Sequence, residues 1–502
     1  MVESAGTAAP GPGREVERAG LPDTADPSRE RPSPSPSRAP SAPVQRCQKL
    51  GVTMDALPDE LLLMVLGRVD DALTLLEEVP LVCKRWHRLS QDPRAWRSAS
   101  VLIEGCTYYE NSYKGEHENH AEILNAARVL VHAPALRHVS FGWYSASPGP
   151  FSCSFDKEMM TSALARSKAQ VHEIEFPQPD MLEGSGLGYP DDPLEDMSPE
   201  ELSLLVDFLS RNRKHVRYLK LGHMLQAGTQ FQRALGQCEN LEELHLMLPD
   251  GFQYQGELRG RRLPKLNRLT LKSWYKVEHC RPFLRDLFGA VAQSVRHVRC
   301  KDLCLSSKDV LAELPRCLEL RSLHCGVEGV AAVKTLTRLR SLSLRIQYAD
   351  RDQQRVLSAA ERGLRACAPL LDLRVLRLDG GFEYGGKWGS QHSQALAALL
   401  RTLGTKTPNV THLSTSGMLT RQVSPETVLA LLKSLPRLQS VHIDRFRFDC
   451  LPALAEVGRM KRLSGEVSYR EGEGDGCRAA VEQLKRQRPD LDCKLSDHQS
   501  YY

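Results

Sequence analysis

The 502-residue sequence has no long hydrophobic run, and neither charge is in strong excess. No apolar stretch approaches the ~20 residues that a membrane-spanning helix requires, so we expect no membrane association. The chain carries 67 Lys and Arg residues against 62 Asp and Glu residues, which gives a net charge of +5. This bias is too small to indicate a nucleic-acid partner.

The cysteines also lack the features of a disulfide framework or a zinc site, because the 14 of them are scattered without paired spacing. The opening residues, MVESAGTAAPGPG, lack the charged and then apolar order of a signal peptide. We therefore expect a reduced cytoplasmic or nuclear protein, which uses its cysteines mainly as small core residues.

Two segments have the composition of disordered chain. Residues 1–50 are rich in Pro, Ser, Ala and Arg and contain few large apolar residues, so burial cannot offset the entropy of ordering them. Residues 177–200 hold seven acids and no Lys or Arg. This second segment is expected to be a disordered insertion, although its charge would also suit a guard over a basic surface or a partner-binding segment.

Residues 57–97 are the most informative stretch of the chain. The run LPDE at its start predicts a helix, because Pro is tolerated at the first helical position and carboxylates complement the unpaired N–H groups there. A second helix is expected over 73–79 and a third from Pro80. The face of the third helix would be formed by Val82, Cys83, Trp86 and Leu89. Three helices in about 40 residues bury too small a core to be stable alone, so this unit must rest on another surface.

The order of the motifs in this stretch, LP with two acids and aliphatic residues, then VC-x-x-W, then DP-x-x-W, resembles the F-box. In that family the module docks a substrate receptor onto the Skp-type adaptor of an SCF ubiquitin ligase and, through it, a cullin-RING core. The resemblance implies an adaptor-binding set on the first helix and the VC-x-x-W helix. Its members here are Leu57, Pro58, Leu61, Leu62, Val65, Leu66, Val82, Cys83 and Trp86. The alternative is that the three helices only cap the array that follows.

A six-residue pattern, apolar-x-x-apolar-x-apolar, recurs eleven times beyond the helical unit. Most copies lie 19–29 residues apart, as in leucine-rich repeats, while others carry insertions. Helices are expected between copies at 201–210, 283–293, 395–403 and 425–435, and a degenerate copy near 460–463 precedes a helix at 478–488. The copies begin at Leu136, Val171, Val216, Leu241, Leu266, Val295, Leu320, Leu339, Leu373, Val410 and Leu438.

One strand followed by one helix cannot bury its apolar face alone, so neighbouring copies must stack into a parallel sheet backed by helices. This arrangement resembles the leucine-rich-repeat horseshoe, and its pairing with an F-box resembles the F-box/leucine-rich-repeat family. We predict an α/β protein with a disordered tail at 1–50, a small three-helix F-box-like unit at 51–100 and an irregular leucine-rich-repeat solenoid with a C-terminal cap at 101–500.

Strand alternation sends the residues between the apolar positions onto the concave face of the solenoid. In the fifth to eighth copies this exposed set holds five basic residues and no acid, which suits an acidic or phosphorylated segment of a protein substrate. The alternative is that these are solvated surface charges. The basic residues are Arg268, Lys272, Arg299, Lys301 and Arg345.

Three patterns resemble catalytic signatures but lack essential parts. Residues 381–387 have the spacing of a phosphate-binding loop, yet Trp388 stands where a metal-binding Ser or Thr belongs. His117 and His120 lie three residues apart rather than four, and Cys300 and Cys304 have no second pair nearby. We expect no catalytic site, cofactor or metal.

The leading hypothesis is therefore a non-catalytic substrate-recognition subunit of an SCF-type E3 ubiquitin ligase. The alternative is a leucine-rich-repeat scaffold or inhibitor that binds a partner without engaging a ligase. A nucleotide-dependent enzyme based on residues 381–387 is the third possibility. The sequence does not identify the protein substrate.

Overall fold

The computed structural model describes residues 54–103, 120–141, 154–176, 199–222, 229–248, 253–273, 280–301, 312–346, 353–380, 390–416, 425–469 and 473–499. The chain divides into two units, Met1–Leu57 and Pro58–Tyr502. In the first unit the described part contains one short 3-10 helix, η2 (Met54–Ala56). The predicted disordered tail, the acidic segment up to residue 198, and the loop 381–388 lie outside the described residues. No described helix is both long and apolar enough to cross a membrane.

The second unit begins with a group of short helices. These are α1 (Asp59–Leu66), the π-helical turn η3 (Thr74–Glu78), α2 (Val79–Val82), α3 (Lys84–Ser90) and the 3-10 helix η4 (Pro93–Trp96). Their core contains Leu62, Leu66, Leu75 and Trp96, each at most 2% exposed. The Trp96 indole Nε1 donates a hydrogen bond to the Ser90 carbonyl oxygen at 2.7 Å, so its polar edge is satisfied inside the core.

The predicted third helix is wrong in one respect, because it is interrupted at Cys83. This residue has extended backbone angles, φ −167° and ψ 170°, and lies between α2 and α3. Its carbonyl oxygen accepts the first hydrogen bond of α3, from the His87 amide at 2.9 Å, as expected of a residue that caps a helix start. Val82 and Cys83 therefore do not share a helix with Trp86 and Leu89.

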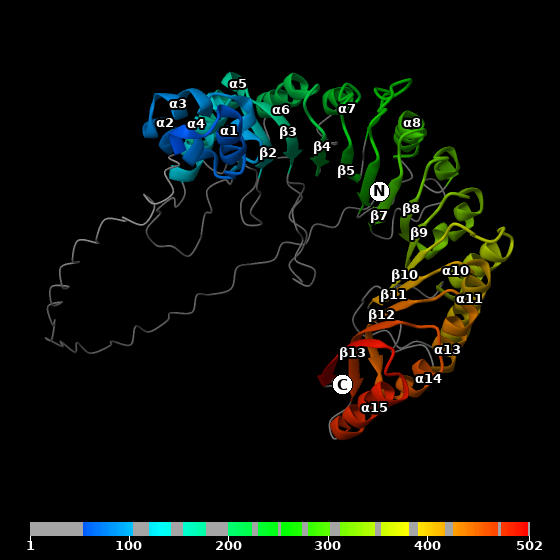
Figure 1. The fold of residues 1–502 in the computed structure, drawn as a ribbon. Coiled ribbons are helices and arrows are strands. Elements are labelled where there is room, and N and C mark those ends of the chain that lie inside the picture. Colours follow the sequence, from blue (N-terminus) through cyan, green and yellow to red (C-terminus); the bar gives the residue numbers. More distant parts are fainter. Residues whose placement is uncertain are drawn as a thin grey trace, which may run out of the picture. The chain divides into compact units, whose positions relative to one another are not determined.

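A single parallel sheet forms most of the second unit, and its described strands follow one another in chain order. In this unit the helices lie on the outer side of the curved sheet and the strands on its inner side (Figure 1). The strands are β1 (Ser100–Ile103), β2 (Ala135–Phe141), β3 (Gln170–Glu175), β4 (Tyr218–Leu221), β5 (Glu243–Leu248), β6 (Arg268–Ser273), β7 (His297–Lys301), β8 (Ser322–Gly326), β9 (Ser341–Ile346), β10 (Val375–Gly380), β11 (His412–Ser416), β12 (Ser440–Arg447), β13 (Arg462–Tyr469) and β14 (Asp492–Gln499).

The predicted repeat pattern is confirmed by the strand register. The eleven copies coincide with β2 to β12, and the degenerate copy near 460–463 leads into β13. The fourth residue of each copy pairs with the fourth residue of the next, as Leu219 does with Leu244 and Leu244 with Leu269. These three side chains are at most 1% exposed. A continuous row of buried aliphatic residues therefore runs through the array.

The helices between strands vary more than the strands do. They include α4 (His120–His132), α5 (Ser154–Arg166), α6 (Pro199–Asn212), α7 (Thr229–Leu235), α8 (Arg281–Val291), α10 (Gln353–Arg365), α11 (Ser390–Lys406), α13 (Pro425–Ser434), α14 (Leu451–Ala455) and α15 (Gly474–Gln487). Three 3-10 helices also lie between described strands, η8 (Leu314–Arg316), η9 (Val327–Thr335) and η10 (Phe448–Cys450). The five helices predicted from sequence correspond to α6, α8, α11, α13 and α15, with ends shifted by a few residues.

The helical unit is joined to the sheet without a linker. Its last element leads directly into β1, which pairs with β2. The Ser100 amide donates to the Asp70 carbonyl oxygen at 3.1 Å, and the Ser98 hydroxyl donates to the Gly67 carbonyl oxygen at 2.7 Å. The sequence pattern missed β1 because the position equivalent to the first apolar residue of a copy is Ser98.

Two buried threonines test how the core tolerates a hydroxyl group. Thr415 occupies an apolar position of its copy and its Oγ1 has no hydrogen-bond partner among the described residues, whereas Thr402 Oγ1 donates to Glu361 Oε1 at 2.9 Å. We predict that Thr415→Val raises the free energy of unfolding by about 1 kcal/mol, because it removes an unsatisfied buried group. Thr402→Val is the matched control and should lower it by about 1–3 kcal/mol. Urea denaturation measures both, and similar losses in the two variants would contradict the prediction.

Candidate functional site

Exposed apolar side chains gather on the helical unit. Of the ten large hydrophobic residues exposed in the described part of the chain, five lie on α1 and α2. We call them the docking face: Leu61 (45% exposed), Met64 (65%), Val65 (46%), Leu81 (83%) and Val82 (61%). Single exposed hydrophobic residues are ordinary, but such a concentration on two short helices is typical of a protein-binding surface.

The structure divides the sequence-predicted adaptor-binding set. Pro58, Leu61, Val65, Val82 and Cys83 are exposed, Trp86 is half-buried, and Leu57 is a half-buried residue of the first unit. The prediction of an exposed binding position is wrong for Leu62 and Leu66, because their side chains are 1% and 2% exposed and belong to the core of the helical unit. The helical period explains the division, since residues at i and i+4 share a face, and 62 and 66 are rotated about 100° around α1 from 61 and 65.

Met64 and Leu81 are members of the docking face that sequence reasoning missed. Met64 lies three residues after Leu61, which places both on one face of α1. Leu81 follows Pro80 near the end of the four-residue helix α2 and is the most exposed of the ten hydrophobic residues. Applying the helical period residue by residue would have found Met64. The exposure of Leu81 depends on the break at Cys83, which the pattern did not reveal.

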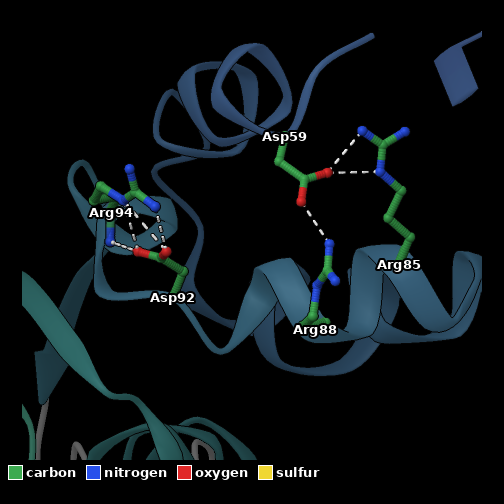
Figure 2. Close-up of polar contacts among 5 residues, drawn as sticks. All are labelled: Asp59, Arg85, Arg88, Asp92 and Arg94. Atoms are coloured by element: carbon green, nitrogen blue, oxygen red, sulfur yellow. Dashed lines mark hydrogen bonds and ion pairs between the residues drawn. The ribbon is translucent and has the colours of Figure 1, made fainter. Parts of the chain in front are cut away.

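Ion pairs connect the start of α1 to α3 (Figure 2). Asp59 at the start of α1 accepts hydrogen bonds from Arg85 Nε at 2.8 Å and from Arg88 Nη2 at 2.5 Å, both on α3. Arg85 is 27% exposed and Arg88 is 69% exposed, so the first contact is better shielded from solvent than the second. Nearby, hydrogen bonds from the Arg94 side chain to Asp92 lower the pKa of that carboxyl group.

The second candidate surface is a groove on the concave face, with a volume of about 1060 Å³, which spans β5 to β12. Four of the five predicted basic residues line it, namely Arg268, Lys272, Arg299 and Arg345. Lys301 is the last described residue of β7. The groove extends beyond the predicted set and adds Arg377, together with two acids, Glu243 and Asp379.

The acids at the first concave strands are already paired. Glu173 contacts Arg137 at 3.1 Å, and Glu243 contacts Arg268 at 3.2 Å. Arg299 and Arg377 are exposed, and neither has an ion pair within the described residues. The available positive charge is therefore concentrated on the strands from β7 onward.

A polar cluster joins β8 to β11 on the groove wall. The Ser343 and Ser416 hydroxyls donate to Asp379 at 2.7 and 2.8 Å, and His324 Nδ1 lies 2.7 Å from Ser343 Oγ. Because the single Ser343 proton goes to the carboxylate, His324 Nδ1 must be the donor in its own contact. A histidine that already carries that proton cannot take one from the serine at this nitrogen, so the cluster is not arranged as a nucleophilic triad.

Burial makes two of the described thiols poor nucleophiles. Burial raises the pKa of Cys300 and of Cys238 to about 12, so both remain protonated at neutral pH. Eight described cysteines are buried, which agrees with the expectation of small core residues. Among the described residues, no group of three or more His, Cys, Asp and Glu side chains is arranged to hold a metal ion.

Positive charge also influences His297 at the groove. Desolvation by burial lowers its pKa most, and Arg268, Arg296 and Arg321 lower it further. We infer a positive electrostatic potential at the first residue of β7.

Glu175 supplies a pH-dependent contribution to stability. Hydrogen bonds from His138 and Lys220 lower its pKa to about 2, although burial opposes the shift. A carboxyl group whose folded pKa lies below its unfolded value stabilises the fold above about pH 4.3 and loses that contribution as the pH falls toward 2. We predict that Glu175→Gln lowers the free energy of unfolding at pH 7 by about 1–2 kcal/mol, after allowance for solvent screening. Denaturation between pH 7 and pH 2 should show the variant converging with the unaltered protein, and a constant difference would contradict this assignment.

Comparison with known families and structures gives three findings. Residues 54–101 match the F-box-like family model, which confirms the resemblance predicted for residues 57–97. A solved complex of Rad7 and Elc1 from yeast matches with 14% identity and a TM-score of 0.35, covering 86% of each chain. The leucine-rich-repeat-containing protein LegL7 from Legionella pneumophila matches with 14% identity and a TM-score of 0.32, covering 77% of this chain and 97% of that one. Comparison with curated proteins gives no match.

Proposed function

We propose that this protein is a substrate-recognition subunit of an SCF-type E3 ubiquitin ligase. Its docking face binds a Skp-type adaptor, and through it a cullin-RING core, while the concave groove binds a target protein. The concentration of exposed apolar residues on α1 and α2, inside the segment that matches the F-box-like model, is the observation that carries this proposal.

The docking face and the concave groove differ in polarity, as expected of a receptor that binds a different partner at each surface. The docking face is apolar, so its burial against an adaptor would gain about 25 cal/mol per Å² of apolar area removed from water. The groove is polar, and the guanidinium groups of Arg299 and Arg377, which have no ion pair among the described residues, are exposed to a target. An acidic or phosphorylated segment would form charge-assisted hydrogen bonds with them.

The proposed receptor acts by bringing its target close to the ubiquitin carrier, and it performs no chemical step itself. Binding a target and a ligase core at once makes the meeting of a target lysine with a charged ubiquitin carrier effectively intramolecular. The receptor then needs no catalytic residue, cofactor or metal. We propose the cytoplasm or the nucleus as its compartment.

Replacing two residues of the docking face tests the adaptor arm. We predict that the double variant Leu61→Asp and Leu81→Asp weakens binding to a purified Skp-type adaptor by at least about 100-fold, because two carboxylates would be desolvated at the interface. Calorimetry or surface plasmon resonance measures the effect. The matched control is Leu318→Asp with Leu371→Asp, which alters two exposed leucines of the repeat array.

The control variant should bind the adaptor as the unaltered protein does. Undiminished adaptor binding by the docking-face variant would favour the alternative, a repeat scaffold or inhibitor that never engages a ligase. Both variants should have the same thermal denaturation midpoint as the unaltered protein, which would show that the substitutions did not unfold the helical unit.

Charge reversal tests the target arm. We predict that changing Arg268, Lys272, Arg299 and Lys301 together to Glu abolishes capture of target proteins. Adaptor affinity should stay within about twofold, because charges on the concave face are screened from the docking face at physiological ionic strength. Quantitative mass spectrometry of proteins that co-purify with each variant provides the measurement. The control reverses four exposed basic residues on helices, Arg233, Arg362, Arg401 and Lys485. Unchanged capture by the groove variant would exclude the concave basic residues from target recognition.

A further inference from the structure

Four arginines form a row outside the groove. Each is the residue immediately before a strand, β7, β8, β9 or β10, and none lines the concave groove. We call this row the rim ladder: Arg296, Arg321, Arg340 and Arg374.

Backbone hydrogen bonds hold the ladder in register. The Arg321 amide donates to the Arg296 carbonyl oxygen, Arg340 to Arg321, and Arg374 to Arg340, each at 2.8 Å. The row ends at uncharged neighbours, since Arg296 donates to Asn267 and Thr411 donates to Arg374. Adjacent strands lie about 4.8 Å apart, so the four backbone positions span about 14 Å.

The ladder guanidinium groups lack acidic partners in the described part of the chain. Arg296, Arg340 and Arg374 are exposed, and Arg321 is half-buried. Arg374 donates to the carbonyl oxygens of Leu371 and Leu373, and no described carboxylate contacts any ladder member. The turns that lead into β7, β8, β9 and β10 all lie within the described residues, so the lack of acidic partners holds for these turns as well.

The same rim position elsewhere shows what a paired arrangement looks like. Arg217 precedes β4 and Glu242 precedes β5, and their side chains lie 3.9 Å apart. Glu319, two residues before the ladder member Arg321, forms an ion pair with Arg338. Like charges directly opposite each other on adjacent strands are destabilising, so an unrelieved row of four costs stability that an anionic ligand would restore.

We propose that the rim ladder binds a run of consecutive anionic side chains on an extended peptide, separately from the concave groove. An extended chain advances about 3.3 Å per residue, so a run of four or five acidic residues spans the ladder's 14 Å. Because successive side chains alternate, two or three of its carboxylates would face the row of guanidinium groups. Arginine suits this role because its planar guanidinium group donates two parallel hydrogen bonds to a carboxylate or a phosphate. The inference does not depend on adaptor docking.

A nucleic-acid partner fits the rim less well. Proteins that bind single strands combine positive charge with aromatic side chains on which bases stack. The residues that follow the ladder members are His297, Ser322, Ser341 and Val375, and one of these four described residues carries a ring.

Fluorescence polarisation with labelled synthetic probes tests the proposal on the full chain. The probes are a peptide of six glutamates, a peptide of the same length with phosphoserines, and a six-residue oligothymidylate. The ladder variant Arg321→Gln with Arg340→Gln should bind the acidic peptides about tenfold or more weakly, because two charge-assisted contacts are lost. The matched control Arg233→Gln with Arg401→Gln removes the same charge from exposed positions on helices and should bind within about twofold.

The outcomes separate the explanations. Selective loss in the ladder variant supports the proposal, and the tighter of the two peptides identifies whether carboxylates or phosphates are the preferred anions. Equal loss in both variants, no loss in either, or tighter binding of the oligonucleotide than of both peptides would overturn it. Arg340→Lys keeps the charge and the fold but not the bidentate fork, so it should show an intermediate affinity. The thermal midpoint of the ladder variant should stay level or rise, because repulsion along the row is relieved.

Discussion

The register of one row of buried aliphatic residues determines the rest of this structure. Because each strand pairs in parallel with the next at the same position of its copy, Leu219, Leu244 and Leu269 stack into a continuous core and every other position follows. A slip of one residue would turn that row to solvent and the charged residues inward, so burial enforces the register strongly. The groove and the rim ladder exist only because this register repeats identical positions side by side.

The sequence was sufficient for the repeats because their signal has a fixed internal spacing. Apolar residues at positions one, four and six report burial directly, and insertions between copies do not disturb them. The first position is Ser98 at β1 and Asp490 at β14, so the two end strands carried too little apolar signal. Irregular ends are expected in arrays that must present a final face to water.

The candidate surfaces were predicted less completely, and for a different reason. Motif matching identified the F-box-like segment but treated its aliphatic residues as one set, whereas packing buries Leu62 and Leu66 and exposes Leu61 and Val65. The groove's Arg377 and Asp379 were missed because only four copies were considered as its wall. The rim ladder depends on residues that are distant in sequence and become neighbours only through strand pairing, so no local pattern reveals it.

The joint between the helical unit and the first strand has a mechanical consequence. Bonds from Ser98 to Gly67 and from Ser100 to Asp70 tie the last helical turn and the first strand to the loop after α1, and Asp71 forms a β-bridge with Ser100. The covalent chain and these hydrogen bonds therefore both cross the joint, whereas a tether would provide the covalent chain alone. A body bound to the docking face would have little freedom to swing about β1, so its orientation would be set by folding rather than by the length of a linker.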